Sequence, residues 1–251
     1  MLKKLPKILI FLILAVFLVA SNVMALPLTD RLEGVFNDIA EDKHNDVNVY
    51  NDMLSDAFDS TWMMTASNGM VATFIIELAG FASDNTFGVY DTGSSGDINF
   101  VELFAGHDGP GDHAFLFINA DGSVVANGTP YDPGTFSGNS FGFYITTPQV
   151  LGYTYYSDTD LNPDDYDHMF AYQGTGESVK LHSNAMIGPW TDNEYILAWE
   201  DLYGGGDQDF EDLVVMVASV QPVPEPATML LLGSGLIGLA TFGRKKFFKK
   251  S

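Results

Sequence analysis

Between residues 61 and 220 the chain alternates short runs of β-branched and aromatic residues with turns rich in glycine, aspartate, asparagine and proline. One turn, Ala120-Asp121-Gly122, is typical of a β-hairpin, because Asp-Gly supplies the positive φ angle that a tight turn requires. The pattern predicts an all-β fold, an antiparallel β-sandwich or jelly-roll-like domain. We expect strands at residues 71–78, 87–90, 98–104, 114–119, 123–126, 141–147, 153–156, 168–172, 194–199 and 213–220.

The last two expected strands carry side chains that predict burial. Residues 213–218 are apolar on both faces, so this strand should be central in its sheet. Tyr195, Leu197 and Trp199 share one face of the strand before it, and we expect them in the core. Apolar residues make up 46% of the chain, which is enough to form such a core.

A short extension, residues 26–60, precedes the expected sandwich. Asp30 and Glu33 have the spacing of a capping box, and apolar residues follow at helical intervals. This predicts an amphipathic helix that ends near Ala40. Residues 45–60 are polar and acidic, so we expect a loop there with at most one short second helix.

Residues 1–25 have the three parts of a secretory signal peptide. Three lysines in the first seven residues give a positive start, and residues 8–20 are continuously apolar. Val23-Met24-Ala25 then places small residues at a cleavage site. We therefore expect signal peptidase to cut after Ala25. An uncleaved membrane anchor is the alternative, although the apolar run is short for a membrane span.

A second targeting segment occupies residues 221–251. A proline-rich stretch ends at Pro226, residues 227–242 are apolar and uncharged, and basic residues close the chain. Because a basic cluster beside an apolar helix stays in the cytoplasm, the order predicts a transmembrane helix at 227–242 with the body of the protein outside.

This order of features resembles the PEP-CTERM sorting signal. The resemblance implies recognition by an exosortase, a membrane protease of Gram-negative bacteria that make exopolysaccharide. It implies a transient anchor in the inner membrane, removal of the tail, and release to the cell surface or the extracellular matrix. A plain C-terminal anchor is the alternative. The residues that the exosortase would read are Val223, Pro224, Glu225 and Pro226.

The exported body is more acidic than the whole chain. The chain has 11 Lys and Arg against 33 Asp and Glu, a net charge of −22. Eight of the 11 basic residues lie in the two targeting segments, which leaves three in the body. Glu225 is the one acidic residue outside 26–221, which leaves 32 of the 33 in the body. The net charge of the body is therefore 3 − 32 = −29. This excludes general nucleic-acid binding, since phosphates need Lys and Arg. The absence of cysteine excludes a disulfide scaffold and thiolate zinc sites.

Two acidic loops predict calcium sites, because calcium takes six to eight oxygen ligands. The first, residues 158–167, begins like an EF-hand loop, but Pro163 stands where the invariant glycine belongs. The second, residues 200–212, contains three consecutive glycines and has no Lys or Arg near it in sequence, so its carboxylates would repel one another without a cation. A solvated acidic loop is the alternative for each. The candidate Ca²⁺ ligands are Glu200, Asp201, Asp207, Asp209 and Asp212 in the second loop, and Asp158, Asp160, Asn162 and Asp164 in the first.

The second loop is also part of a longer stretch of the chain that resembles an all-β domain of unknown function found in many PEP-CTERM proteins. The resemblance spans residues 85–219 and implies no established activity. The common pattern has Asn where this chain has Glu211. The most specific motif is Ala198-Trp199-Glu200-Asp201-Leu202 with Gly205-Gly206-Asp207-x-Asp209-Phe210-x-Asp212-Leu213-Val214.

No catalytic constellation is evident, since the chain has neither a His-Glu-x-x-His motif nor a Walker phosphate loop. We therefore predict a non-enzymatic exported protein of the cell surface or of an exopolysaccharide or biofilm matrix, with a calcium-stabilised β-sandwich. A module that binds the host exopolysaccharide is the alternative, and a hydrolase that uses two carboxylates is a third. Aromatic residues that could stack on sugars are Trp62, Tyr153, Tyr155, Tyr156 and Trp190.

Overall fold

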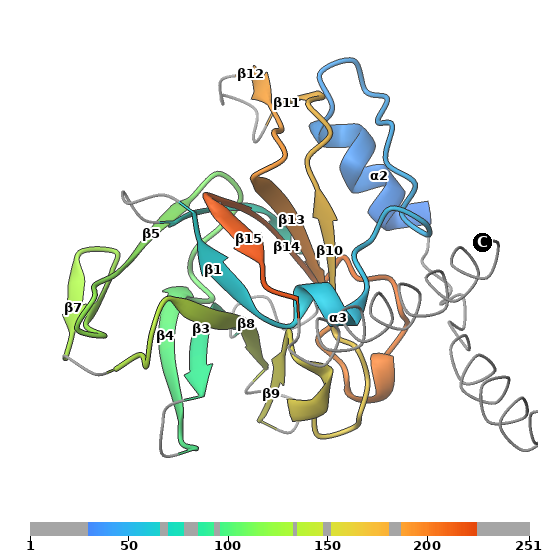
Figure 1. The fold of residues 1–251 in the computed structure, drawn as a ribbon. Helices are drawn as coiled ribbons and strands as arrows, with labels where there is room; N and C mark the ends of the chain where they lie inside the picture. Colours follow the sequence, from blue (N-terminus) through green and yellow to red (C-terminus); the bar gives the residue numbers. More distant parts are fainter. Residues whose placement is uncertain are drawn as a thin grey trace, which may run out of the picture.

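The strands of the chain form two large antiparallel sheets (Figure 1). The computed structural model describes residues 30–65, 70–77, 85–92, 96–132, 135–147, 152–180 and 187–224. The expected signal peptide with Ala25, and the expected membrane helix 227–242 with Glu225 and Pro226, lie outside these residues. None of the helices in the described part of the chain has the length and apolar character that crossing a membrane requires.

The first sheet has six strands. Their order is β15-β1-β8-β3-β4, and β9 pairs with β8 off this path. The strands are β1 (Trp62–Met64), β3 (Thr86–Thr92), β4 (Ile98–Phe104), β8 (Ser140–Thr147), β9 (Tyr153–Tyr156) and β15 (Val220–Pro222).

The second sheet has seven strands in the order β10-β13-β14-β2-β5-β6-β7, and a separate two-stranded sheet pairs β11 with β12. The seven strands are β2 (Met70–Glu77), β5 (His113–Ile118), β6 (Val124–Ala126), β7 (Thr129–Tyr131), β10 (Met169–Gln173), β13 (Glu194–Trp199) and β14 (Leu213–Ala218). The small sheet consists of β11 (Ser178–Lys180) and β12 (Ile187–Pro189).

Two α-helices and two short 3₁₀ helices complete the described structure. The amphipathic helix predicted from the capping box is α2 (Asp30–Ile39), and the short second helix in the polar segment is α3 (Asp56–Asp59). The 3₁₀ helices η1 (Thr159–Leu161) and η2 (Tyr203–Gly205) lie in the two acidic loops.

A hydrophobic core fills the space between the two large sheets and confirms the all-β sandwich. Trp62 of the first sheet packs edge-on against Tyr195 of the second, with ring centroids 4.9 Å apart. Phe87 meets Trp199 across the same space at 6.1 Å. Burying such large rings supplies most of the free energy that holds the sheets together.

A second core lies on the other face of the seven-stranded sheet, under α2 (Figure 1). Phe36 of α2 packs against Tyr172 of β10 with ring centroids 4.9 Å apart. β14 has residues in both cores, since Val215 belongs to the first and Val214 to the second. This confirms that the 213–218 strand is central and buried on both faces, as its pattern predicts.

The structure also differs from the sequence-based assignment of strands. The expected strand 213–220 is divided at Ser219, which has a positive φ of 66° and directs the chain from the second sheet into the first. The strands β1, β7, β11, β12 and β15 were not expected. Each has three residues, which is too few for an alternating pattern to be recognised.

Two glycines let tyrosine rings lie across the first sheet. Gly142 of β8 is paired with Tyr90 of β3, and Gly88 of β3 is paired with Tyr144 of β8. A Cβ atom on Gly142 would lie 2.3 Å from the Tyr90 ring, and one on Gly88 would lie 2.8 Å from the Tyr144 ring. The sheet therefore has no space for larger residues at these two positions.

We expect Gly142→Ala to lower the free energy of unfolding by at least about 2 kcal/mol, because the added methyl displaces the Tyr90 ring. Gly138→Ala is the matched control, since a Cβ atom there meets nothing within 4 Å. Urea unfolding of both variants measures the difference. Equal stability of the two variants would contradict this account of the packing.

Candidate metal centre

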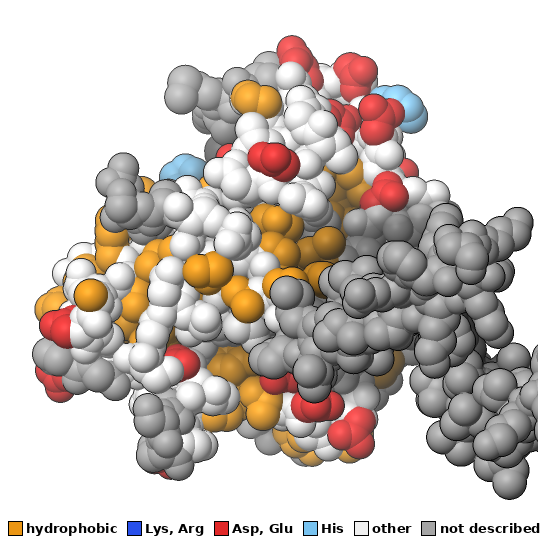
Figure 2. Space-filling view, viewed as in Figure 1, with side chains coloured by type: hydrophobic (Ala, Val, Ile, Leu, Met, Phe, Trp, Pro, Cys, Tyr) orange, Lys and Arg blue, Asp and Glu red, His pale blue; other side chains and the backbone are white. Residues whose placement is uncertain are grey.

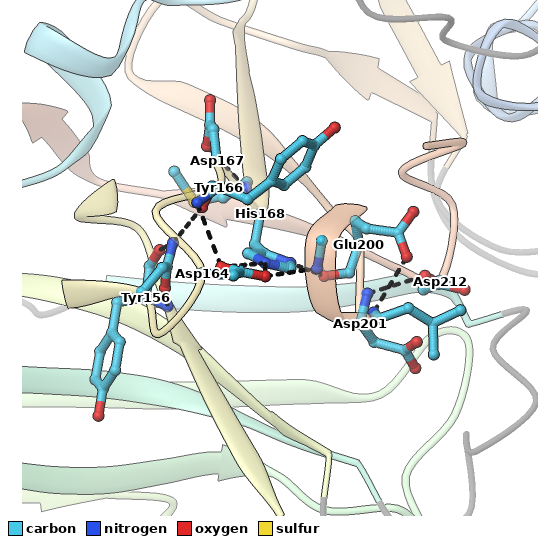
Figure 3. Close-up of polar contacts among 12 residues, drawn as sticks. Tyr156, Asp164, Tyr166, Asp167, His168, Glu200, Asp201 and Asp212 are labelled. Atoms are coloured by element: carbon cyan, nitrogen blue, oxygen red, sulfur yellow. Dashed lines mark hydrogen bonds and ion pairs between the residues drawn. The ribbon is translucent and has the colours of Figure 1, made fainter. Parts of the chain in front are cut away.

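The second acidic loop closes the hairpin between the central strands β13 and β14. Trp199 and Leu213 form the last pair of this ladder, so the residues that follow and precede them emerge side by side. The backbone N–H of Asp201 donates to the Asp212 carboxylate at 3.0 Å (Figure 3). The hairpin register therefore brings Glu200, Asp201 and Asp212 together at the end of a buried ladder.

The loop backbone wraps around the Glu200 carboxylate. That carboxylate accepts hydrogen bonds from the N–H of Leu202 at 3.1 Å and from the N–H of Gln208 at 2.9 Å. Gly206 has a positive φ of 43°, and a Cβ atom there would lie 2.4 Å from a Glu200 oxygen. Glycine is needed at this position, because the backbone could not otherwise approach the carboxylate so closely.

Two groups of three carboxylates share Glu200. One group is Glu200, Asp207 and Asp209, and the other is Glu200, Asp201 and Asp212. In each group one oxygen per residue lies within 4.8 Å of the other two, close enough to bind one metal ion. Glu200 is fully buried, and Asp201 and Asp209 are nearly so. The five candidate ligands of the second loop thus gather around one buried side chain.

Asn85 joins this cluster from the first sheet, immediately before β3. Its amide nitrogen donates to Asp201 at 2.9 Å. Its amide oxygen is buried and has no hydrogen-bond partner among the residues that the structure describes. An amide oxygen is a common calcium ligand. Sequence reasoning missed Asn85, which lies 116 positions from Asp201 and in no recognisable motif.

Burial governs the protonation of the cluster. Burial and the neighbouring Asp212 carboxylate raise the pKa of Glu200 to about 9. Burial and the Asp201 carboxylate raise the pKa of Asp212 to about 7. Without a cation, protons neutralise part of this site at neutral pH.

Arg31 brings a positive charge to the second loop, although no Lys or Arg lies near that loop in sequence. It reaches over from α2, and its guanidinium donates to Glu211 at 2.5 Å and to Asp209 at 3.3 Å. The Arg31 side chain is 66% exposed, so solvent weakens both ion pairs. Glu211, where the common pattern has Asn, therefore pairs with α2 and belongs to neither metal-compatible group.

The first acidic loop is not gathered in this way. Asp158 caps η1 by accepting from the N–H of Asp160, whose side chain is exposed. Asn162 accepts from the N–H of Tyr156 at 2.7 Å and donates to the carbonyl oxygen of Tyr166 at 2.8 Å. Among the described residues, the groups with metal-compatible geometry draw on the second loop alone.

Asp164 instead connects the first loop to the second. Its carboxylate accepts from the N–H of Gly204 in η2 at 2.6 Å and contacts Nε2 of His168 at 3.0 Å. Nδ1 of the fully buried His168 lies 2.7 Å from the carbonyl oxygen of Glu200 (Figure 3). Although burial opposes it, these hydrogen bonds lower the pKa of Asp164. The first loop thus holds the second in position.

A further buried carboxylate belongs to the last residue of α3. Asp59 is 1% exposed, and neither of its carboxylate oxygens has a hydrogen-bond partner in the described structure. Burial and the neighbouring Asp56 carboxylate raise the pKa of Asp59 well above its usual value. Burial therefore shifts the Asp59 equilibrium towards the protonated acid.

Most of the aromatic residues named as possible sugar platforms are internal, as expected for aromatic side chains in an all-β domain. Trp62, Trp190 and Tyr155 are fully buried. Tyr153 is half-buried, and its ring lies 5.2 Å from the exposed ring of Tyr203 in η2. Sequence reasoning did not name Tyr203 among the aromatic candidates, because it lies within the acidic loop.

Gly138-Asn139-Ser140-Phe141-Gly142 has the spacing of a nucleophile elbow, which sequence reasoning also missed. Such an elbow requires a sharp turn from a strand into a helix. Here Ser140 is the exposed first residue of β8, and the chain continues as a strand. The spacing alone therefore gives no hydrolase site.

Comparison with known families agrees with both resemblances. Residues 111–220 match a domain of unknown function, DUF4114, and residues 222–246 match the PEP-CTERM protein-sorting motif. No curated protein matches the chain. The sorting motif indicates export through an exosortase and a location at the cell surface or outside the cell. The domain match contains the whole 200–212 loop but begins after Asn85.

In the absence of divalent cations, we expect the free energy of unfolding to fall by at least about 1 kcal/mol between pH 5 and pH 9. The folded protein holds protons on Glu200 and Asp212 that the unfolded chain releases, so this stability is present at low pH and is lost as the pH rises through about 7 and about 9. Urea unfolding in chelator at several pH values measures the trend.

Glu200→Gln is the matched control for this prediction. The amide keeps the shape of the side chain and does not ionise, so the variant should show a flatter pH dependence. A wild-type stability that is constant or that rises from pH 5 to pH 9 would contradict the prediction.

Proposed function

We propose that this exported protein is a non-enzymatic component of the cell surface or of an extracellular exopolysaccharide matrix, and that calcium bound around Glu200 stabilises its β-sandwich. The observation that carries the proposal is that two groups of three carboxylates share the buried side chain of Glu200. Asn85 adds an amide beside one of these groups through its hydrogen bond to Asp201.

The donor set favours calcium over transition metals. Both metal-compatible groups contain carboxylates alone, and Asn85 adds an amide oxygen. Hard oxygen donors suit calcium, whereas zinc and copper prefer imidazole and thiolate ligands. The ion pairs of Arg31 go to Asp209 and Glu211, and no described residue forms an ion pair with Glu200, Asp201 or Asp212.

The position of the cluster supports a structural role for the ion. The 200–212 loop belongs to the seven-stranded sheet, and Asn85 leads into β3 of the six-stranded sheet. An ion that binds both segments would connect the two layers of the sandwich. A chain with no cysteine has no disulfide that could make such a connection. Because the unfolded chain lacks the assembled site, the binding free energy adds to folding stability.

The same burial favours a non-catalytic role. Glu200 has no exposed surface, and its oxygens already accept hydrogen bonds from backbone N–H groups. A general acid or base must come within hydrogen-bond distance of its substrate.

Figure 2 shows acidic side chains gathered at the top and at the bottom of the face drawn, which suits an exported protein kept soluble by its charge.

Calcium should raise the unfolding midpoint of the purified protein relative to chelator. For an affinity of about 0.1–1 mM, about 10 mM calcium should add about 1.4–2.7 kcal/mol of stability. Asp201→Asn and Asn85→Ala should each reduce this gain, because each change removes an oxygen ligand or its charge. Asp160→Asn, at an exposed position of the first loop, is the matched control. An identical wild-type midpoint in calcium and in chelator would remove the calcium part of the proposal.

Glycan binding is a second candidate, favoured by the aromatic pair of Tyr153 and Tyr203. Tyr203 is 54% exposed and lies within the candidate calcium loop, so its ring could stack on a sugar while the loop is held by the ion. The exopolysaccharide of the producing bacterium is the relevant probe.

Retention of the protein on the immobilised exopolysaccharide tests this second candidate. Tyr203→Ala should lower retention severalfold, whereas Tyr50→Ala, which alters an exposed tyrosine far from the loop in sequence, should not change it. Wild-type protein that passes through the column unretained would exclude glycan binding.

A further inference from the structure

The folded domain and the sorting motif overlap in this chain. The match to the sorting motif begins at Pro222, which is also the last residue of strand β15. β15 forms the edge of the six-stranded sheet and is paired with β1 (Figure 1). No linker therefore separates the sandwich from the segment that the exosortase reads.

The pairing continues into the motif itself. The N–H of Val223 donates to the carbonyl oxygen of Thr61 at 2.7 Å, one residue beyond the end of β15. At the other end of the strand, the N–H of Thr65 donates to Ser219 at 2.9 Å. Val220 is fully buried and belongs to the core between the sheets. The first residues of the motif are thus part of the folded sheet.

This arrangement restricts how a membrane protease can approach. Val223 is the first residue of the Val223-Pro224-Glu225-Pro226 motif. The start of the motif is therefore held at the sheet edge whenever Val223 is hydrogen-bonded to Thr61. A protease that binds its substrate as an extended strand needs the same backbone groups that β1 occupies.

We propose that the exosortase acts on a form of the protein in which β15 has separated from β1, so that release of this edge strand precedes cleavage of the tail. The proposal rests on the sorting motif and on the strand pairing, and it does not depend on calcium binding.

Several features make this release feasible. β15 has three residues and pairs with one neighbour, and Pro222 has no N–H to donate. Gln221 is exposed, so Val220 is the fully buried side chain that would be uncovered. Ser219 holds a positive φ of 66°, which is strained for a residue with a side chain and is relieved when the strand detaches. Short edge segments of this kind open locally while the rest of the domain stays folded.

A disulfide across the strand pair tests the proposal. Met63 and Gln221 are directly paired, and their side chains contact each other on the outer side of the sheet, with Nε2 of Gln221 3.2 Å from Sδ of Met63. Paired Cα atoms lie about 4.5–5.5 Å apart in antiparallel sheets, which suits a disulfide. The chain contains no cysteine, so Met63→Cys with Gln221→Cys introduces one defined crosslink.

The measurement is cleavage of the full-length chain in membranes that contain the exosortase, followed by mass spectrometry. The oxidised double variant should be cleaved at least about tenfold more slowly than wild type, because the crosslink removes the open form. Reductant should restore cleavage. Each single-cysteine variant is a matched control and should be cleaved at the wild-type rate.

A variant with an inserted linker distinguishes the effect of strand release from other effects of the crosslink. Ten Gly and Ser residues inserted between Pro222 and Val223 of the crosslinked variant should restore cleavage, because the motif then reaches the enzyme while β15 stays paired. The proposal is wrong if the oxidised variant without the linker is cleaved at the wild-type rate. It is also wrong if the crosslinked variant with the linker remains uncleaved, since the block would then not arise from the paired strand.

Discussion

Repulsion among buried carboxylates at the β13–β14 turn is the constraint around which the surrounding structure is arranged. The ladder that ends at Trp199 and Leu213 is buried on both faces, so its register places the buried Glu200 beside the half-buried Asp212. Like charges that are close and desolvated destabilise the folded state unless something neutralises them. The backbone N–H groups of Leu202 and Gln208, the Asn85 amide and a proton or a metal ion are the available neutralising groups.

The other layers of the molecule support this turn from both sides. Helix α2 covers the outer face of the seven-stranded sheet, and its Arg31 forms ion pairs with Asp209 and Glu211. The loop before β10 supplies Asp164, which holds η2 through Gly204. The first acidic loop therefore acts through hydrogen bonds to the backbone of the second. The two loops form one unit because β13 pairs with both β10 and β14.

Features that depend on local sequence patterns were predictable from the sequence, whereas features that depend on contacts between distant residues were not. Helix α2 and the long strands were predictable, because their periodicity is local. Strand β15 was not separable from β14, since one backbone angle at Ser219 divides an apolar run that looks continuous. Which aromatic ring stays exposed was not predictable, because composition does not distinguish a buried ring such as Trp62 from an exposed one such as Tyr203. Arg31 and Asn85 were missed because their partners are more than a hundred positions away.

By itself, the sequence determined the class of the fold and the destination of the protein. Alternating strands, the motif at 222–246 and the distribution of charge are all local patterns, which a single chain displays without folding. Tertiary structure decided which carboxylates meet, which cation reaches them, and how closely the sorting motif is joined to the sheet. These depend on the register between strands distant in sequence, and register is set by packing across the whole core. Glu200 is recognisable from its motif, but its burial beside Asn85 follows from the way the two sheets close on each other.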